Sequence, residues 1–523
     1  MNGLEITVVL GTAVLVGSVL APRLRMATPL FLLGVGIVLG FVPELREIEL
    51  PPEFVLLLFL PVMLFWESLT TSLRAIRRDF RAVVLLSTLL VVATAFGVAG
   101  IAHAFGIPWA SALVLGAAVA PPDATAVGAL GRSLPHRNFM ILKAESLTND
   151  GTALVVYGIA IGIAAGDSYS SLDVTGLVLR SYVGGVLAGV GVAFVFYLLL
   201  RRLHDATSIN VALLLVPFVA YLVAELGHAS GVLAVVTSGL VMAYASTRIS
   251  TAASRRTTES VWPLGSYVLN GALFVLIGLE AHAVTRNIPV GDGVRLLGCV
   301  VAVWLGLMVI RFVFQTLSVL IIRLLDRRPS QHERRMDYRA RVVSAVAGFR
   351  GAISLALALS VPTVARDGSP FPVRDEIIIV TAGVIVLTLL VQGPLLPRVA
   401  AWARLPEDAA APDELRTTER ALLDAALTAA PELSSRLGIG DEVRDRLVAG
   451  YRRRRDQVDA TTTSTPLVQD EEYSRLLLAL MTPKRDVLRS MRQSGMIDDV
   501  VAHRIQTQLD VEELRLRGVE PLD

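Results

Sequence analysis

Residues 118–127 read Ala-Val-Ala-Pro-Pro-Asp-Ala-Thr-Ala-Val, and they lie inside an apolar segment long enough to cross a membrane. Each proline removes a backbone donor and disfavours helix in the residue before it. We therefore expect the helix to break at Pro121 and Pro122, beside Asp123. A broken helix at membrane depth is tolerated only inside protein or around a water-filled cavity. An incidental kink would leave Asp123 unexplained, so the stretch predicts a functional break.

The rest of the chain has the composition of a membrane protein. Of its 523 residues 54% are hydrophobic, whereas soluble domains are roughly 45–50% apolar. Long apolar runs separated by short charged loops predict an all-α polytopic membrane protein. We predict about thirteen transmembrane spans, at residues 4–21, 28–42, 52–70, 82–103, 109–130, 139–164, 172–200, 209–227, 230–247, 261–282, 294–322, 342–361 and 376–402.

Several other classes of protein find no support. The single Cys299 rules out an internal disulfide. The first apolar run is long enough to stay as an anchor and has no basic segment before it, so no cleavable signal peptide is expected. The sequence has no phosphate-binding loop, zinc-ligand spacing or nucleophile elbow at a position where it could function. No sequence feature favours nucleic-acid binding.

Orientation follows from arginine, which is concentrated in alternate loops. One set of loops carries 20 arginines and the other set carries 4. Because cytoplasmic loops are the positively charged ones, we expect the N-terminus outside and residues 404–523 inside. Residues 1–403 then form the transmembrane domain and residues 404–523 a helical cytoplasmic tail. The basic run Arg452–Arg455 in this tail is expected to be a solvated helix face rather than a lipid contact.

A second interrupted span resembles the first in its place along the chain. Residues 347–352 read Ala-Gly-Phe-Arg-Gly-Ala, with a charge at the centre of the twelfth span. This span follows the fifth by seven, so spans 1–6 and 8–13 form two six-helix repeats of inverted topology. Paired discontinuous helices in inverted repeats cross at the binding site of many transporters.

The polar residues of the sixth span complete the candidate site. Ser146, Asn149 and Asp150 stand at helical spacing and share one face. Asp150 lies near mid-span, so it is a candidate cation ligand. Burial disfavours the charged form of a carboxylate, which makes it a candidate proton carrier as well. Glu67, towards the cytoplasmic end of the third span, is either an edge residue reaching the interface or a ligand.

Two basic residues inside spans leave alternatives open. Arg311 lies deep in the eleventh span, where its partner is either a carboxylate or a lipid headgroup. Lys143, near the cytoplasmic start of the sixth span, is expected to be solvated.

Together these motifs resemble the bacterial sodium/proton exchangers of the monovalent cation/proton antiporter-1 family. The resemblance covers the whole membrane part. It is carried by residues 121–123 (Pro-Pro-Asp), 145–150 (Glu-Ser-Leu-Thr-Asn-Asp), 274–280 (Phe through Glu), 350–355 (Arg-Gly-Ala-Ile-Ser-Leu) and 392–394 (Gln-Gly-Pro).

The resemblance implies roles for individual residues. Asp150 binds the ion and the proton, and Asn149 stands where the electrogenic branch has a second aspartate. Asp123, Ser146 and Glu67 contribute to the cation site. Glu145 and Arg350 form a buried structural ion pair, in which losing one partner would strand the other. The resemblance also implies a homodimer and alternating access by one bundle sliding against a dimeric scaffold.

Two departures from the family pattern stand out. Many relatives have Thr-Asp-Pro where residues 122–124 read Pro-Asp-Ala, so a hydroxyl ligand is missing. Lys143 replaces an acidic residue that is common in bacterial relatives.

We therefore expect a cell-membrane antiporter that exchanges sodium, or lithium, for a proton and serves pH and sodium homeostasis. It would be neither an enzyme nor dependent on a cofactor, with monovalent cations, protons and membrane lipid as its partners. Exchange would be electroneutral because Asn149 does not titrate. A potassium/proton antiporter with the same site is the first alternative. An intramembrane aspartyl protease using Asp123 and Asp150, and a non-transporting sensor, are more remote.

Overall fold

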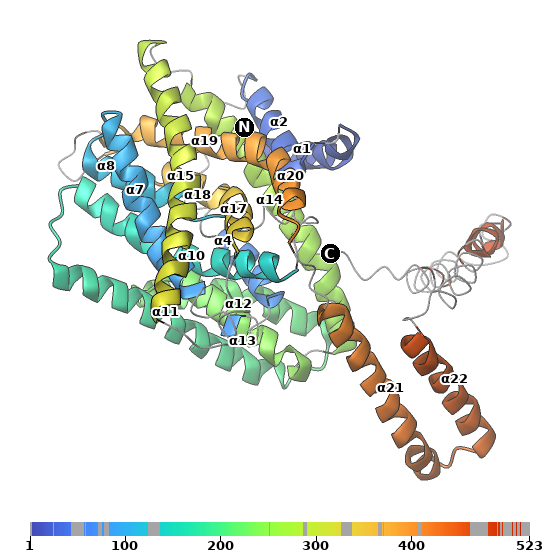
Figure 1. The fold of residues 1–523 in the computed structure, drawn as a ribbon. Coiled ribbons are helices and arrows are strands. Elements are labelled where there is room, and N and C mark those ends of the chain that lie inside the picture. Colours follow the sequence, from blue (N-terminus) through green and yellow to red (C-terminus); the bar gives the residue numbers. More distant parts are fainter. Residues whose placement is uncertain are drawn as a thin grey trace. The chain divides into compact units, whose positions relative to one another are not determined.

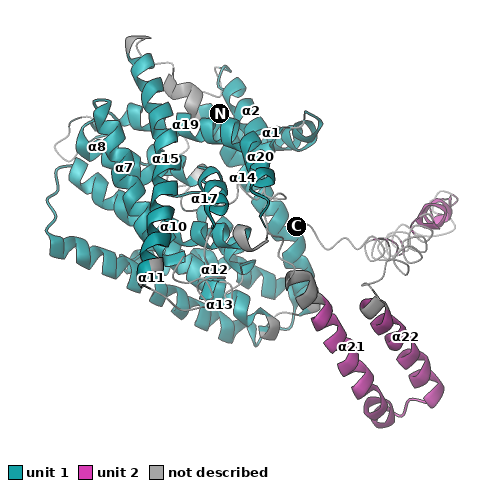
Figure 2. Cartoon of the chain, in the orientation of Figure 1, with its two compact units in different colours: residues 1–406 teal, residues 407–523 magenta. Residues whose placement is uncertain are grey.

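The computed structural model describes residues 3–24, 26–42, 59–71, 83–123, 136–249, 251–285, 290–325, 337–364, 371–405 and 410–460, together with isolated positions outside these ranges. Within them the regular structure is helical, without a β-strand. Backbone contacts divide the chain into two units, residues 1–406 and 407–523 (Figure 2).

The first unit is an assembly of apolar helices (Figure 1). All thirteen predicted spans contain described helix, and eight of these helices are long and apolar enough to cross a membrane. In chain order the helices are α1 (Gly3–Arg23), α2 (Thr28–Leu39), α4 (Leu60–Leu69), α7 (Leu90–Ala104), α8 (Trp109–Val119), α10 (His136–Ala164), α11 (Ser171–Leu200), α12 (Ala206–Leu226), α13 (Gly231–Ile249), α14 (Ala252–Thr285), α15 (Val290–Leu325), α17 (Tyr338–Val346), α18 (Ala352–Leu359), α19 (Arg374–Leu387) and α20 (Gly393–Ala403).

Among the elements that the structure describes in full, two single turns of π-helix interrupt the regular helical pattern. The first, η3 (Leu85–Leu89), leads directly into α7. The second, η5 (Thr388–Gln392), joins α19 to α20. Such turns inside membrane helices are frequent at functional sites.

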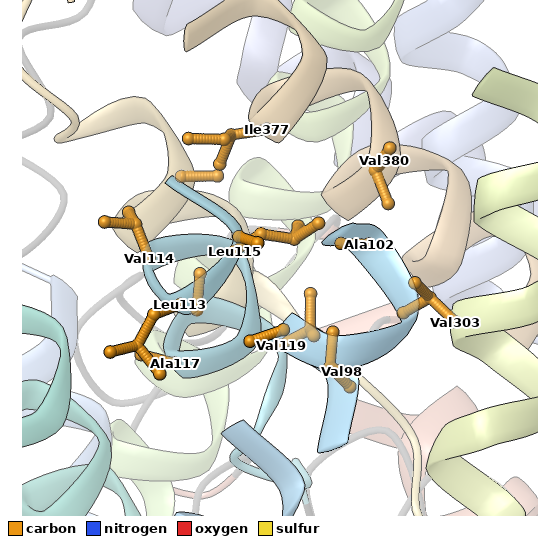
Figure 3. Packing of buried hydrophobic residues seen from close by; sticks show 14 of the residues in the cluster. Val98, Ala102, Leu113, Val114, Leu115, Ala117, Val119, Val303, Ile377 and Val380 are labelled. Carbon is orange, nitrogen blue, oxygen red and sulfur yellow. The ribbon is translucent and has the colours of Figure 1, made fainter. Parts of the chain in front are cut away.

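A large hydrophobic cluster joins the two predicted repeats (Figure 3). Its buried side chains come from α7, α8 and α10 of the first repeat and from α15, α18 and α19 of the second. Small residues let the backbones approach closely: a Cβ on Gly116 would lie 2.1 Å from the carbonyl oxygen of Ala95. Close approach of this kind stabilises membrane helices, which gain little from burying apolar surface out of lipid. Close backbone packing thus joins α7 to α8 within the first repeat.

Two further clusters surround this one. The first joins α4 to α11, α12 and α13, with Leu147 of α10 packed against them. The other joins α1, α2 and α14 to α17, α19 and α20. On the outer face of α11, Val183, Leu187 and Phe194 are exposed at helical spacing. An apolar helix face of that length is suited to lipid rather than water.

The second unit contains α21 (Ala410–Leu437) and α22 (Asp441–Ala460), which pack against each other. Gly438, at φ +66°, allows the tight turn between them. Three of the four arginines at 452–455 are exposed, and Arg455 lies 3.6 Å from Asp424 of α21. Most of the basic run is therefore exposed on α22, and its solvation rather than lipid contact stays a prediction.

Candidate functional site

Two broken helices cross inside the first unit, at the two places where the sequence predicts breaks. Helix α8 ends at Val119, immediately before the prolines, and the twelfth span is split into α17 and α18 by residues 347–351. The backbone N–H of Asp123 donates to the carbonyl oxygen of Phe349, 2.9 Å away. A Cβ on Gly351 would lie 1.6 Å from Asp123 Oδ2, so only glycine allows this approach. The break in the twelfth span and the end of α8 before Pro121 are confirmed, whereas residues 124–135, after the first break, lie outside the described residues.

Arg350 binds backbone carbonyl oxygens at the two breaks instead of forming the predicted ion pair. Its side chain is buried, and its Nε donates to the carbonyl oxygen of Val119 at 2.8 Å. Nη2 donates to Ala120 O at 3.3 Å and Nη1 to Gly348 O. The last carbonyls of a helix lack intrahelical partners and carry partial negative charge. The guanidinium therefore caps α8 and also binds the backbone of the break that follows α17.

The predicted ion pair between Glu145 and Arg350 is wrong: Glu145 pairs with Arg311. The Glu145 carboxylate accepts from Arg311 Nη1 at 2.5 Å and from Nη2 at 2.7 Å, and both side chains are buried. Arg311 Nε also donates to Ser344 O at 2.9 Å, so α10, α15 and α17 meet at this pair. A lone charge deep in an apolar span needs a partner. Of the two partners left open for Arg311, the carboxylate is the one observed.

The predicted polar face of α10 is buried at the crossing. Ser146, Asn149 and Asp150 are 5%, 0% and 2% exposed. Asn149 Nδ2 donates to the carbonyl oxygen of Pro122 at 3.1 Å, which ties α10 to the break after α8. A carbonyl accepts and does not donate, so this contact fixes which amide atom faces the break. Asn149 Oδ1 and Asp150 Oδ2 are both buried without a hydrogen-bond partner.

Asp123 and Glu67 lie near Asp150 but do not form a closed cage with it. Both are partly exposed, Asp123 at the break and Glu67 in the last turn of α4. Each is close enough to Asp150 for their charges to repel. Among the described residues, however, no three acidic, histidine or cysteine side chains gather closely enough to hold a metal ion together. A cation at Asp150 would need neutral oxygens to complete its shell, and Asn149 Oδ1 is the nearest such oxygen in sequence.

Sequence reasoning missed the polar contacts of two side chains near this face, Thr152 and Lys143. Thr152 Oγ1, half a turn beyond Asp150, donates to the carbonyl oxygen of Ser87 at 2.6 Å and hydrogen-bonds to the hydroxyl of Tyr182. Ser87 lies in the π-helical turn η3, and no residue pattern announces such a turn. Lys143 was expected to be solvated, but it is partly buried, and its Nζ donates to Thr70 Oγ1 at 2.7 Å.

Crossed discontinuous helices in inverted repeats, with a buried carboxylate beside the crossing, are typical of secondary transporters. The family model described as "Sodium/hydrogen exchanger, transmembrane" matches residues 10–402. The chain therefore belongs to the sodium/hydrogen exchanger family.

Individual relatives agree with this assignment. The chain is 37% identical to an uncharacterized Na+/H+ exchanger of Mycobacterium tuberculosis, over all of this chain and 97% of the relative. It is 32% identical to the sodium, potassium, lithium and rubidium/H+ antiporter of Bacillus subtilis, over 71% of this chain and 57% of that protein. Among solved structures, the sodium proton antiporter MjNhaP1 of Methanocaldococcus jannaschii has a TM-score of 0.59 at 19% identity, covering 77% of this chain and 99% of that one. This last similarity shows a shared fold.

At the level of the family, the chain is a multi-pass membrane protein that exchanges a monovalent cation for a proton. Its relatives are transporters, which supports the expectation that it is not an enzyme.

Proposed function

We propose that this protein exchanges sodium or lithium for a proton, and that the two compete for Asp150. One observation supports this most directly: Asp150 Oδ2 and Asn149 Oδ1 are buried without hydrogen-bond donors. Buried acceptors are nearly always satisfied, so a pair left open needs an explanation. A bound cation would accept electron density from both oxygens, and a proton would satisfy the carboxylate alone. Asp123, Ser146 and Glu67 would assist with charge or oxygen ligands.

Competition gives obligatory exchange. Sodium prefers oxygen ligands, and a proton binds the same carboxylate, so each excludes the other. Moving an empty, charged site through the membrane costs the most free energy. The site therefore crosses when either the cation or the proton neutralises it.

Electroneutral exchange is proposed from Asn149. Its side chain does not titrate, and its amide is held by Pro122 O. Asp150 would then release one proton for each monovalent cation bound. Glu67 and Asp123 would supply charge without taking part in the exchange of protons.

Potassium/proton exchange is the second candidate. Among relatives of similar identity, the Bacillus subtilis antiporter is named for potassium as well as sodium. An open shell completed by neutral oxygens is also less restrictive about ion radius than a cage of carboxylates.

The wider organisation is proposed from sequence and family. Residues 1–403 would form the transport domain in the cell membrane, with the N-terminus outside, and residues 404–523 would form a cytoplasmic tail. The protein would act as a homodimer, in contact with membrane lipid, in pH and sodium homeostasis. No cofactor is proposed.

Inside-out vesicles from antiporter-deficient cells test the proposed exchange. Adding sodium, lithium or potassium should release the quench of a pH-sensitive dye, with sodium and lithium effective at the lowest concentrations. On a solid-supported membrane, the same sodium addition should move no net charge, because one proton leaves for each cation. Potassium acting at the lowest concentration would favour the second candidate. A steady transport current would contradict electroneutral exchange.

A further inference from the structure

Lys143 is held near the candidate site by a contact between two helices. Its Nζ, on α10, donates to Thr70 Oγ1, at the end of α4, over 2.7 Å. The Thr70 hydroxyl in turn lies 3.2 Å from the carbonyl oxygen of Glu67, one turn earlier in α4. The Thr71 hydroxyl donates to the same carbonyl at 2.6 Å. The ammonium group is thus fixed one helical turn from Glu67 by a short network.

Lys143 shares the face of α10 that carries the candidate ligands. Ser146 and Asp150 follow it at three and seven residues, which is the spacing of neighbours along one side of a helix. Seven residues correspond to about 10 Å along the axis. The charge of Lys143 attracts Glu67, and Glu67 in turn interacts with Asp123 and Asp150. No ion pair within 4 Å joins Lys143 and Glu67, so the amine stands near this carboxylate without neutralising it by contact.

We propose that Lys143 is a tethered cation that sets the apparent affinity for sodium on the cytoplasmic side. Held by Thr70, its ammonium group offsets the attraction that Glu67 exerts on an arriving cation. An incoming sodium ion therefore meets a vestibule of low net charge and reaches Asp150 without being retained at Glu67. Lys143 is a specificity-determining residue in this account, and the account rests on the proposed exchange at Asp150.

Removing this charge should strengthen the attraction for sodium. In Lys143→Met and Lys143→Gln, Glu67 is no longer opposed, so the sodium concentration giving half-maximal dye response should fall. Because the two charges interact without direct contact, we expect a modest decrease of about three- to fivefold. Lys143→Arg keeps the charge and should stay within about twofold of the wild type.

Inside-out vesicles are the right preparation, because they present the cytoplasmic face to the added sodium. The measurements are the half-maximal sodium concentration and the maximal response of wild type, Lys143→Met, Lys143→Gln and Lys143→Arg, each also in a Glu67→Gln background. We expect the neutral variants to show the decrease with Glu67 present and to lose it in the Glu67→Gln background. A merely structural role for Lys143 would instead lower the maximal response and the amount of folded protein, in both backgrounds alike.

The outcomes separate this proposal from the proposed function. An unchanged or increased half-maximal concentration in both neutral variants, with folded protein in the membrane, would overturn the role of Lys143 while leaving exchange intact. A decrease of equal size in the Glu67→Gln background would overturn it too. If the wild type gave no response to any cation, the proposed function itself would be contradicted.

Discussion

Replacing Asp150 with asparagine is expected to reduce sodium-driven proton movement to the background of vesicles without the protein. Asparagine is nearly the same size, so the crossing of the broken helices should persist. It neither binds a proton at neutral pH nor offers a charge to a cation. The variant would therefore lose both cation binding and proton binding at this site. The measurement is dye dequenching in inside-out vesicles with sodium, lithium and potassium.

Asp292→Asn is a matched control for this change. Asp292 is exposed in the first turn of α15, 3.8 Å from Arg295. The same loss of one charge there should leave the sodium response within about twofold, because exposed pairs contribute little. If Asp150→Asn exchanged sodium for protons as well as the wild type does, Asp150 could not be the shared binding site.

The second large effect is expected at the ion pair of Glu145 and Arg311. Glu145→Gln or Arg311→Met leaves one buried charge without its partner. Such losses destabilise by about 3–5 kcal/mol. Each single variant should therefore show a much lower apparent melting temperature in detergent than the wild type. The double variant should be more stable than the sum of the single effects predicts, since no charge is then stranded.

Arg350 distinguishes this pairing from the one expected from sequence. Arg350→Gln removes the cap of α8 and the contact with Gly348 O in the break after α17, so it should destabilise by a separate route. Its effect should add to that of Glu145→Gln, whereas the effect of Arg311→Met should not. If instead Glu145 coupled to Arg350 as strongly as to Arg311, the observed pairing would be refuted.

The backbone features of the site were predictable because they depend on local chemistry. Pro121 and Pro122 cannot continue a hydrogen-bonded helix, and Gly348 and Gly351 flank a charge inside an apolar span. These residues locate both breaks without knowledge of the fold. Helical spacing was likewise enough to place Ser146, Asn149 and Asp150 on one face, and the structure buries all three.

The partners of charged side chains were not predictable in the same way. Glu145 had two arginines available, in spans 11 and 12, and spacing along the chain does not rank them. The packing of the broken helices determines which arginine pairs with Glu145. It places Arg350 against the carbonyl oxygens of Val119 and Ala120, and it leaves Arg311 facing α10. Lys143 shows the same limit, because its contact with Thr70 depends on how α4 packs against α10.

Competition between sodium and proton for one carboxylate is the central claim. Its most direct test is the half-maximal sodium concentration of wild-type vesicles as a function of pH. When a proton and a cation share one site, lowering the pH raises the concentration of cation needed, by up to about tenfold per pH unit, while saturating sodium restores the full rate. We expect this rise between about pH 8 and pH 6.5, with a constant maximal rate. A half-maximal concentration that stays constant while the maximal rate falls would show that protons act elsewhere, and would contradict competition at Asp150.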